Sequence, residues 1–277
     1  MELLTNAFAR RAYELITINP AVEGHSELLK EAYDDVYVPA FPVDDERQPL
    51  QVWMDRTDPK STSSNKYVVI VAGSNLNDPK NRIIEGISVG IYYSKAQVGL
   101  MAYNAISPTS RGGGLGHAMV DARIDAFHDL AVQRNEKVRG VFLEVNDPDQ
   151  VNAEEDSFDP AKRLAIFKKW GAEEVPINYI QPALADDTGK FDKLKLLSYA
   201  TKEGVRPDVG AVHDFLYELY RGCGYKQPET DFDFMRMKAD LYDMARTTGY
   251  SFGKTIGVST AKIFPFPRND LPAAIPA

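Results

Sequence analysis

The sequence predicts a mixed α/β (α+β) domain, in which helices flank one central sheet. The first observation is a β-like run, residues 98–106, that leads through a glycine-rich loop into a helical run at residues 115–133. The second is the run 141–145, which is apolar apart from one carboxylate and is therefore typical of a central strand. With 44% hydrophobic and 26% charged residues, the chain is close to globular averages, so we expect a packed core.

The spacing of apolar residues predicts each element in turn, alternation indicating strands and a three-to-four-residue period indicating helices. The expected strands are residues 12–18, 66–72, 83–93, 97–106, 141–145, 175–180 and 194–199. The expected helices are residues 26–36, a short helix over 50–54, and residues 115–133 and 161–170. Two prolines, Pro39 and Pro42, exclude a regular helix over residues 38–42. Gly171 is suited to end the last of these helices.

The pattern changes after residue 204. Residues 209–221 and the stretch that begins at Phe234 have apolar side chains at helical spacing, which predicts two further helices. The last stretch contains four prolines and is expected to be a draped or disordered tail. The sequence therefore divides into a domain over residues 11–203, a helical extension over 204–248 and a tail over 249–277.

Composition excludes several classes of protein. The net charge of −8 argues against a nucleic-acid binder, which needs Lys and Arg for the phosphates. No apolar run of ~18 residues is present, so no membrane-spanning helix is expected. The N-terminus lacks the apolar segment of a secretory signal, and we expect a cytoplasmic protein. The one cysteine, Cys223, and four scattered histidines have no metal-ligand spacing, so no metal is expected.

The glycine-rich loop is the strongest indication of a ligand. It reads Ser110-Arg111-Gly112-Gly113-Gly114-Leu115-Gly116-His117. Glycines let a ligand approach the backbone, and the free N–H groups of a following helix favour an anion. The loop lacks the Lys of a nucleotide P-loop and the spacing of a dinucleotide fingerprint. It does match the pattern Q/R-x-x-G-x-G/A, through Arg111, Gly114 and Gly116. The alternative is a strand-to-helix turn that holds no ligand.

This pattern resembles the acyl-CoA loop of the GCN5-related N-acetyltransferases (the GNAT superfamily). Residues 163–172, which read RLAIFKKWGA, are similar to the family's penultimate helix. Residues 179–184 are similar to a strand ending found in a bacterial subgroup of the family. The resemblance covers about residues 11–202 and leaves the last helices outside it. It implies the GNAT fold, a mostly antiparallel sheet with two splayed strands flanked by helices.

The resemblance also implies a function and a set of binding residues. The chain would be an N-acetyltransferase that uses acetyl-CoA as co-substrate and a small-molecule amine as acceptor, with a homodimer left open. In the family, the backbone of the strand before the loop bonds the pantetheine, and the loop holds the pyrophosphate. By position, the strand residues are Asn104, Ala105 and Ile106, and the loop residues are Arg111, Gly112, Gly113, Gly114, Leu115, Gly116 and His117.

Acyl transfer to an amine requires a base, since the amine must lose a proton before it attacks. Glu144, on the strand beside the implied acyl site, is the first candidate, and Glu85 is the second. The alternative for Glu144 is a sheet-face carboxylate paired with Lys or Arg. The family's usual tyrosine on the penultimate helix corresponds here to Phe167, which has no proton to donate. Tyr179, Tyr103 or solvent would then protonate the leaving thiolate.

Two acidic segments suggest a cationic acceptor. Seven carboxylates lie within residues 144–159, in a stretch without Lys or Arg, and five more lie within residues 34–46. Near one groove, they would concentrate a cationic amine. The alternative is a pair of solvated loops. The sequence also leaves open a non-catalytic acyl-CoA-binding or sensing module, a protein N-acetyltransferase, and a scaffold whose helical extension binds a partner.

Overall fold

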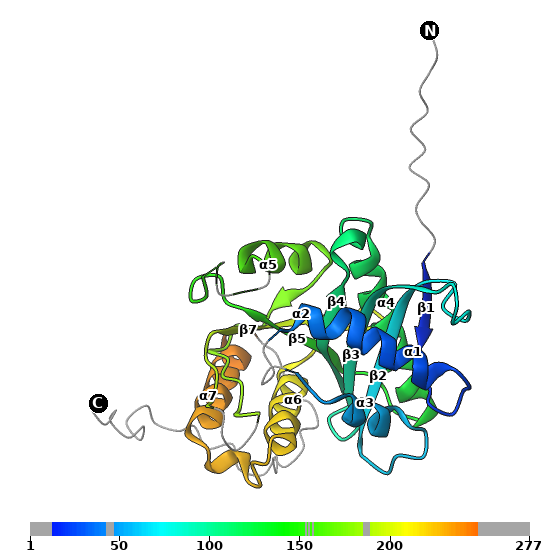
Figure 1. Ribbon diagram of the computed structural model, residues 1–277. Helices are drawn as coiled ribbons and strands as arrows, with labels where there is room; N and C mark the ends of the chain where they lie inside the picture. The colour runs from blue at the N-terminus through cyan, green and yellow to red at the C-terminus, as the bar shows by residue number, and fades with distance from the viewer. Residues whose placement is uncertain are drawn as a thin grey trace.

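The computed structural model describes residues 13–42, 47–152, 154, 156, 158–184 and 189–248. One seven-stranded sheet organises the fold, with the strand order β1-β2-β3-β4-β5-β7-β6 (Figure 1). The strands are β1 (Glu14–Thr17), β2 (Asn65–Ser74), β3 (Ile83–Tyr93), β4 (Val98–Ile106), β5 (Gly140–Asn146), β6 (Glu173–Glu174) and β7 (Leu194–Tyr199). Every neighbouring pair is antiparallel except β4 and β5, which are parallel. The prediction of a mostly antiparallel sheet is confirmed.

The helices follow the predicted order, with one difference near the N-terminus. They are α1 (His25–Ala32), the π-helix η1 (Tyr33–Tyr37), α2 (Val38–Ala40), α3 (Leu50–Thr57), the 3-10 helix η3 (Pro108–Ser110), α4 (Leu115–Gln133), α5 (Pro160–Lys169), α6 (Val209–Gly222), the 3-10 helix η4 (Pro228–Thr230) and α7 (Phe232–Thr248). Residues 38–42 are only partly non-helical, contrary to the expectation, because Pro39 lies in the first turn of α2, where its missing N–H needs no partner, and the helix ends at Ala40. Among the described residues, no helix has the length and apolar composition needed to span a membrane.

Helices cover both faces of the sheet. α4 and α5 pack on one face, and α1 and α3 pack on the part of the other face that β2 and β3 form. In Figure 1, α1 and α3 cross the front of the sheet. Phe127 of α4 shows how close the packing is. A Cβ atom added at Gly90 or Gly99 would lie 2.5 or 2.4 Å from its ring, so both strand positions require glycine.

α6 and α7 cover the rest of that second face and share its core. Phe215 of α6 stacks on Phe142 of β5, with ring centroids 4.4 Å apart, and meets Tyr93 of β3 edge-on at 6.1 Å. α6 and α7 lie side by side against the β4, β5 and β7 half of the sheet (Figure 1). The division into a domain and an extension at residue 204 stays a prediction, and the tail over 249–277 lies outside the described residues.

The strand predicted over residues 175–180 is wrong. Only Glu173–Glu174 pairs with β7, and one further bond joins the Val175 amide to the Leu196 carbonyl at 2.9 Å. The Asn178 and Ile180 amides donate to α7 instead, to Asp240 at 2.9 Å and to Met237 at 3.3 Å. The apolar residues that suggested a strand therefore face the helices of the extension rather than a neighbouring strand.

Candidate active site

The two parallel strands separate after three residue pairs. β4 and β5 pair only from Val98 to Leu100. β4 then contains one extra residue, Ala102, because Gly90 of β3 pairs with Met101 and Val89 pairs with Tyr103. Such a bulge bends a strand and increases its twist. Residues 101–106 of β4 therefore have no partner strand on the β5 side, and we call this gap the β4–β5 opening.

The three residues expected to bond pantetheine lie along this opening. Asn104, Ala105 and Ile106 form the end of β4, where it still pairs with β3 but not with β5. The Oδ1 atom of Asn104 is buried without a hydrogen-bond partner in the described part of the chain, as is the Oγ atom of Ser88 on β3. Ser88 and Asn104 are paired across the two strands. The end of β4 thus contains a buried acceptor, Asn104 Oδ1, that no described residue satisfies.

A buried arginine lies beneath the opening. Arg123 of α4 is 1% exposed and donates from Nη1 to the carbonyls of Tyr103, at 2.9 Å, and Val89, at 3.3 Å. Both carbonyls flank the bulge, so this helix side chain fixes the strand distortion. Burial lowers the pKa of Arg123 to about 10. Sequence reasoning missed this residue, because a helical Arg is ordinarily solvated.

The glycine loop has the conformation expected of an anion site. Gly112 and Gly114 have φ of +85° and +88°, and a Cβ atom at either would meet no other atom within 4 Å. Only glycine adopts this conformation without strain, so the loop is open on the side of these two residues. Gly114 directly precedes α4, whose first N–H groups are free to bond a ligand. A pyrophosphate fits this cradle.

The other loop residues brace the cradle. A Cβ atom at Gly113 would lie 2.4 Å from the Tyr13 hydroxyl, and one at Gly116 would lie 2.8 Å from the Trp170 ring. Leu115 is buried in a cluster with Ala72 and Met119. Tyr13 and Trp170 were missed, because close approach across 100 and 54 residues leaves no local signal.

Two side chains of the loop, His117 and Arg111, make contacts within the protein. His117 is exposed and stacks on Trp170, with ring centroids 5.3 Å apart and planes 6° apart. It therefore joins the start of α4 to the end of α5. The Arg111 Nε atom donates to the Ile106 carbonyl at 3.3 Å, which holds this exposed side chain beside the end of β4. Contact of either side chain with a phosphate stays a prediction.

Glu144 lies on the strand across the opening from β4. Its Oε1 atom accepts hydrogen bonds from the Tyr179 hydroxyl and from Gln181 Nε2, the latter at 2.8 Å. No Lys or Arg in the described residues pairs with it, so the alternative of a sheet-face ion pair is wrong. Burial raises the pKa of Glu144, and the two hydrogen bonds oppose this rise. Tyr179 was a candidate for another step, and Gln181 was missed.

Aromatic side chains surround the same face of the opening. Tyr103 on β4 meets Tyr37 and Phe41 edge-on, with centroids 5.2 and 5.3 Å apart, and its ring lies 6.0 Å from that of Trp53. Burial raises the pKa of Tyr103, and the charge of Glu144 adds to this rise. Carboxylate and aromatic rings together favour a cation.

The second candidate base, Glu85, lies elsewhere. It is 3% exposed on β3, and its Oε1 atom accepts from Ser110 Oγ at 2.7 Å. Its carbonyl accepts from the Ser107 amide at 2.9 Å. The structure therefore brings Glu85 to the start of the glycine loop rather than to Glu144, and its contacts fit an anchor for η3.

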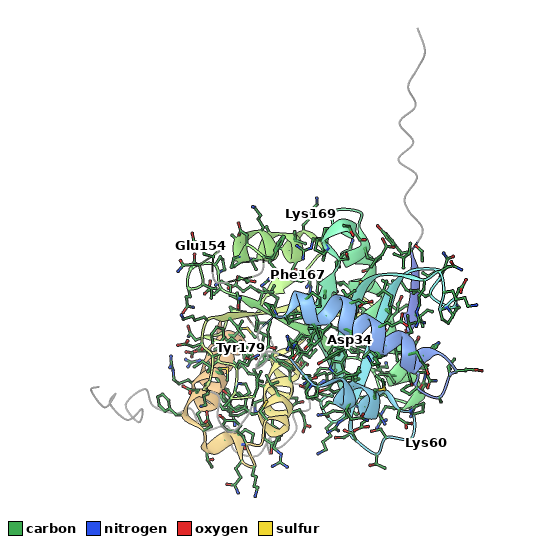
Figure 2. The ribbon with its side chains drawn as sticks, in the orientation of Figure 1. Asp34, Lys60, Glu154, Phe167, Lys169 and Tyr179 are labelled. Atoms are coloured by element: carbon green, nitrogen blue, oxygen red, sulfur yellow. The ribbon has the colours of Figure 1, made fainter. Side chains whose placement is uncertain are left out.

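Phe167, which stands where the family usually has a tyrosine, also has apolar neighbours. Phe167 on α5 meets Trp170 edge-on at 5.6 Å and packs on the face that α4 covers. Tyr179 belongs to the core on the other face, under α6 and α7. Figure 2 shows Phe167 beside α5 and Tyr179 nearer α7. The group that protonates the thiolate stays a prediction.

The acidic segments are largely used for internal contacts. Asp156 accepts from both Nη atoms of Arg163, at 2.6 and 2.7 Å, and from Asn146 at 2.7 Å. Asp159 accepts from the first amides of α5, and Asp147 lies 3.5 Å from Lys195. Asp34 pairs with Lys30 at 2.6 Å. Asp44, Asp45, Glu46 and Glu155 lie outside the described residues. The expected field for a cationic acceptor is therefore weaker than the sequence suggested.

Asp156→Asn should lower the free energy of unfolding by about 1–3 kcal/mol, because it leaves Arg163 without its carboxylate. The Asp156 side chain is 5% exposed, so water does not replace the lost bonds. Urea unfolding of the full chain measures this loss. Glu154 is exposed in the same loop (Figure 2), and Glu154→Gln should change stability by less than about 0.5 kcal/mol. Equal stability of the two variants would contradict the anchoring role of Asp156.

Among the described residues, a polar cavity borders Tyr179 but not Glu144. Its volume is ≈ 280 Å³, and it lies between β7, residues 174–180 and α7. Asp192, Lys195 and Arg236 are among its lining residues, whereas Glu144 is not. Within the described ranges, no three His, Cys, Asp or Glu side chains are grouped to hold a metal ion.

The comparisons with known proteins found only solved structures of low sequence identity. No protein-family model and no curated protein matches the chain. Among solved structures, a protein of Bacteroides thetaiotaomicron described as a GNAT-family acetyltransferase is 14% identical, with a TM-score of 0.48, covering 75% of this chain and 94% of its own. The ribosomal-protein-S18-alanine N-acetyltransferase of Escherichia coli is 13% identical, with a TM-score of 0.41, covering 68% and 93%. A variant of the spermidine N-acetyltransferase of Vibrio cholerae is 11% identical, with a TM-score of 0.41, covering 67% and 92%.

The arrangement of the strands and helices identifies the fold more specifically than these sequence identities and TM-scores. Three central strands lead through a glycine loop into α4, and β4 then separates from its parallel neighbour β5. α1 and α3 lie on one face, and α4 and α5 on the other. This order and this opening are what the resemblance in the sequence predicted, and the chain has the fold of the GCN5-related N-acetyltransferases.

Proposed function

We propose that this protein is an N-acetyltransferase that moves the acetyl group of acetyl-CoA to a primary amine by direct attack. The observation that carries the proposal is the β4–β5 opening, which has a glycine cradle at one end and Glu144 on the strand across it. Acetyl-CoA supplies the activated thioester. Everything else in the reaction is binding, orientation and proton transfer by the chain.

The loop and the strand divide the binding between them. Gly112 and Gly114 leave room for the pyrophosphate, and the N-terminus of α4 stabilises its charge. The unpaired backbone at 101–106 would bond the pantetheine, with Asn104 adding a side-chain acceptor. An amide of the same strand would stabilise the tetrahedral oxyanion.

Glu144 would take the proton of the attacking amine. A carboxylate whose pKa is raised is a stronger base than an exposed one, which suits this step. Tyr179 and Gln181 both bond Oε1, so Oε2 is the oxygen with no partner among the described residues. We assign proton transfer to Oε2. The tyrosine holds the carboxylate still while the other oxygen reacts.

The acceptor would be a small-molecule amine. Glu144 and the aromatic side chains around Tyr103 would attract it, because four carboxylates of the acidic segments, Asp34, Asp147, Asp156 and Asp159, are engaged in ion pairs. A protein N-terminus or lysine is the alternative acceptor in the same fold class. A further alternative is a non-catalytic acyl-CoA-binding module, which Phe167 favours, since it lacks the proton that a tyrosine would offer the thiolate.

One assay separates these functions. The full chain is incubated with acetyl-CoA and either an amine library or peptides, and released CoA is measured with a thiol reagent. Release with small amines supports the proposal, and release with peptides alone supports protein acetylation. A thermal shift with acetyl-CoA, worth ~2.7 kcal/mol at 100 times Kd, without any release identifies a binding module. Neither binding nor release contradicts all three.

Tyr179→Phe should move the acid limb of kcat/KM to higher pH. The change removes a hydroxyl that stabilises charged Glu144 but keeps the apolar surroundings, so the pKa of Glu144 rises further. The base works only when deprotonated, and activity is therefore lost at a higher pH as the solution is acidified. A pH profile of both proteins measures the shift. Tyr217→Phe, whose hydroxyl has no partner in the described residues, should leave the limb in place.

A further inference from the structure

We propose that the C-terminal helices α6 and α7 position Glu144, by holding the segment that supplies both of its hydrogen-bond donors. This inference rests on the proposed function for the role of Glu144 in the reaction. The segment comprises residues 178–181 and 190–191, and we call it the positioning segment. Tyr179 and Gln181 are its contacts to Glu144.

Neighbouring residues of the positioning segment contact Glu144 and the C-terminal helices in turn. Between Tyr179 and Gln181, Ile180 donates from its amide to Met237 Sδ at 3.3 Å and accepts from the Tyr220 hydroxyl at 3.2 Å. Ile180 thus contacts the two helices through its backbone, while its neighbours Tyr179 and Gln181 contact Glu144 through their side chains.

Asn178 gives the segment its firmest link to α7. Its amide and its Nδ2 atom both donate to Asp240 Oδ2, at 2.9 and 3.0 Å. Two charge-assisted bonds to one carboxylate oxygen restrain both the backbone and the side chain. Tyr179 is the next residue, so the position of its hydroxyl depends directly on this link.

A second link holds Gln181 from the other side. Gln181 and Phe191 exchange both backbone hydrogen bonds, at 2.8 and 3.1 Å. The preceding residue, Lys190, places its ammonium 2.7 Å from both Asp231 and Asp233. The same ammonium lies 5.9 and 5.7 Å from the rings of Tyr220 and Tyr225. The contacts of this cation are thus with groups that belong to the extension.

The sheet does not provide this support. Its edge pairing ends at Glu174, and the Val175 amide makes the last bond to β7. Within the described residues, the backbone hydrogen bonds of residues 178 and 180 go to side chains of α6 and α7. α6 and α7 therefore supply the hydrogen-bond partners that a neighbouring strand would supply in a sheet.

The pKa of Glu144 is a measurable indicator of this arrangement. Besides Tyr179, the titratable groups that interact with it are Tyr93 of β3, Tyr103 of β4 and Cys223 beyond α6. Burial raises the pKa of each, to about 11 for Cys223, so all three are neutral near pH 7. Tyr179 and Gln181 are therefore the groups whose displacement changes the titration of Glu144.

Asp240→Ala in the full chain tests the proposal. Two readouts are taken: the titration of Glu144 by NMR of ¹³C-labelled glutamate, assigned by its absence in Glu144→Gln, and the steady-state constants. We expect the pKa of Glu144 to rise, as in Tyr179→Phe, because its donors move away. kcat should fall about 10- to 100-fold, with the KM for acetyl-CoA unchanged.

Three variants complete the test. Asp240→Asn keeps an oxygen acceptor for Asn178 and should restore most of kcat. Asp243→Ala removes a 64% exposed carboxylate from the same helix, which pairs with Arg246, and should behave as the wild type. Lys190→Met loosens the segment from its other end and should reproduce the titration shift, which keeps the test decisive if Asp240→Ala does not fold.

The two readouts separate this inference from the function on which it rests. A folded Asp240→Ala or Lys190→Met protein in which Glu144 titrates as in the wild type overturns the positioning role. A wild type that transfers no acetyl group, together with the titration shift in the variants, removes the proposed function and keeps the positioning of Glu144.

Discussion

Glu144→Gln should lower kcat by ~10²–10⁴-fold and leave the KM for acetyl-CoA nearly unchanged. Glutamine keeps the size of the side chain and an oxygen that can accept from Tyr179, but it cannot take a proton at neutral pH. Steady-state kinetics measure the loss, and Glu154→Gln is the matched control on an exposed loop. Near-normal turnover would remove Glu144 from the reaction.

The same variant should not lose stability, which distinguishes it from an ordinary core mutation. Burial raises the pKa of Glu144, so the folded state favours the protonated form. The stability linked to this group is fully present below the unfolded pKa and is lost as pH rises through the folded value. At pH 8 the wild type therefore carries a charge that the variant lacks. Melting temperatures should favour Glu144→Gln at pH 8 and converge near pH 4.

Gly114→Asp should reduce the affinity for CoA by at least about 100-fold, because a carboxylate would face the pyrophosphate at the N-terminus of α4. The residue has φ of +88° and open space beside it, so the new side chain meets the ligand rather than the protein. Titration calorimetry with CoA measures the affinity.

The neutral isostere Gly114→Asn separates charge from backbone strain. Asn and Asp both tolerate the left-handed conformation better than other residues, and they have the same shape. Gly114→Asn should therefore bind CoA more tightly than Gly114→Asp while melting at a similar temperature. If both variants bind CoA as the wild type does, the loop does not hold the pyrophosphate.

Much of the fold could be predicted because its elements have strong local signals. The bounds of β3, β7 and α4 were predicted without error, and those of α5 within one residue, since their apolar periods are regular. The segment 175–180 has the composition of a strand but not its pairing. What decides its structure is Asp240 on α7, which lies 62 residues from Asn178 along the chain. Local patterns do not contain such a contact.

The candidate site was predictable in part for the same reason. The position of Glu144 on a central strand pointed to it, and Tyr179 was named for a different step. That the two side chains meet follows from the packing of a non-strand segment on α6 and α7. Conversely, Asp156 and Arg163 lie only seven residues apart, but a run of neighbouring acids does not show which one the arginine binds. The attraction of that loop for a cationic amine was therefore overestimated from the sequence.

The core that α6 and α7 share with the sheet also has a consequence for the synthesis of the protein. Ribosomes make the chain from the N-terminus, so Phe142 of β5 and Leu196 of β7 emerge before the helices that cover them. The face that carries these side chains stays open to water until Phe234 and Leu241 of α7 have left the exit tunnel. The half of the sheet that carries Glu144 is therefore covered late in synthesis, and on the proposed function a nascent chain gains its activity only after translation has passed α7.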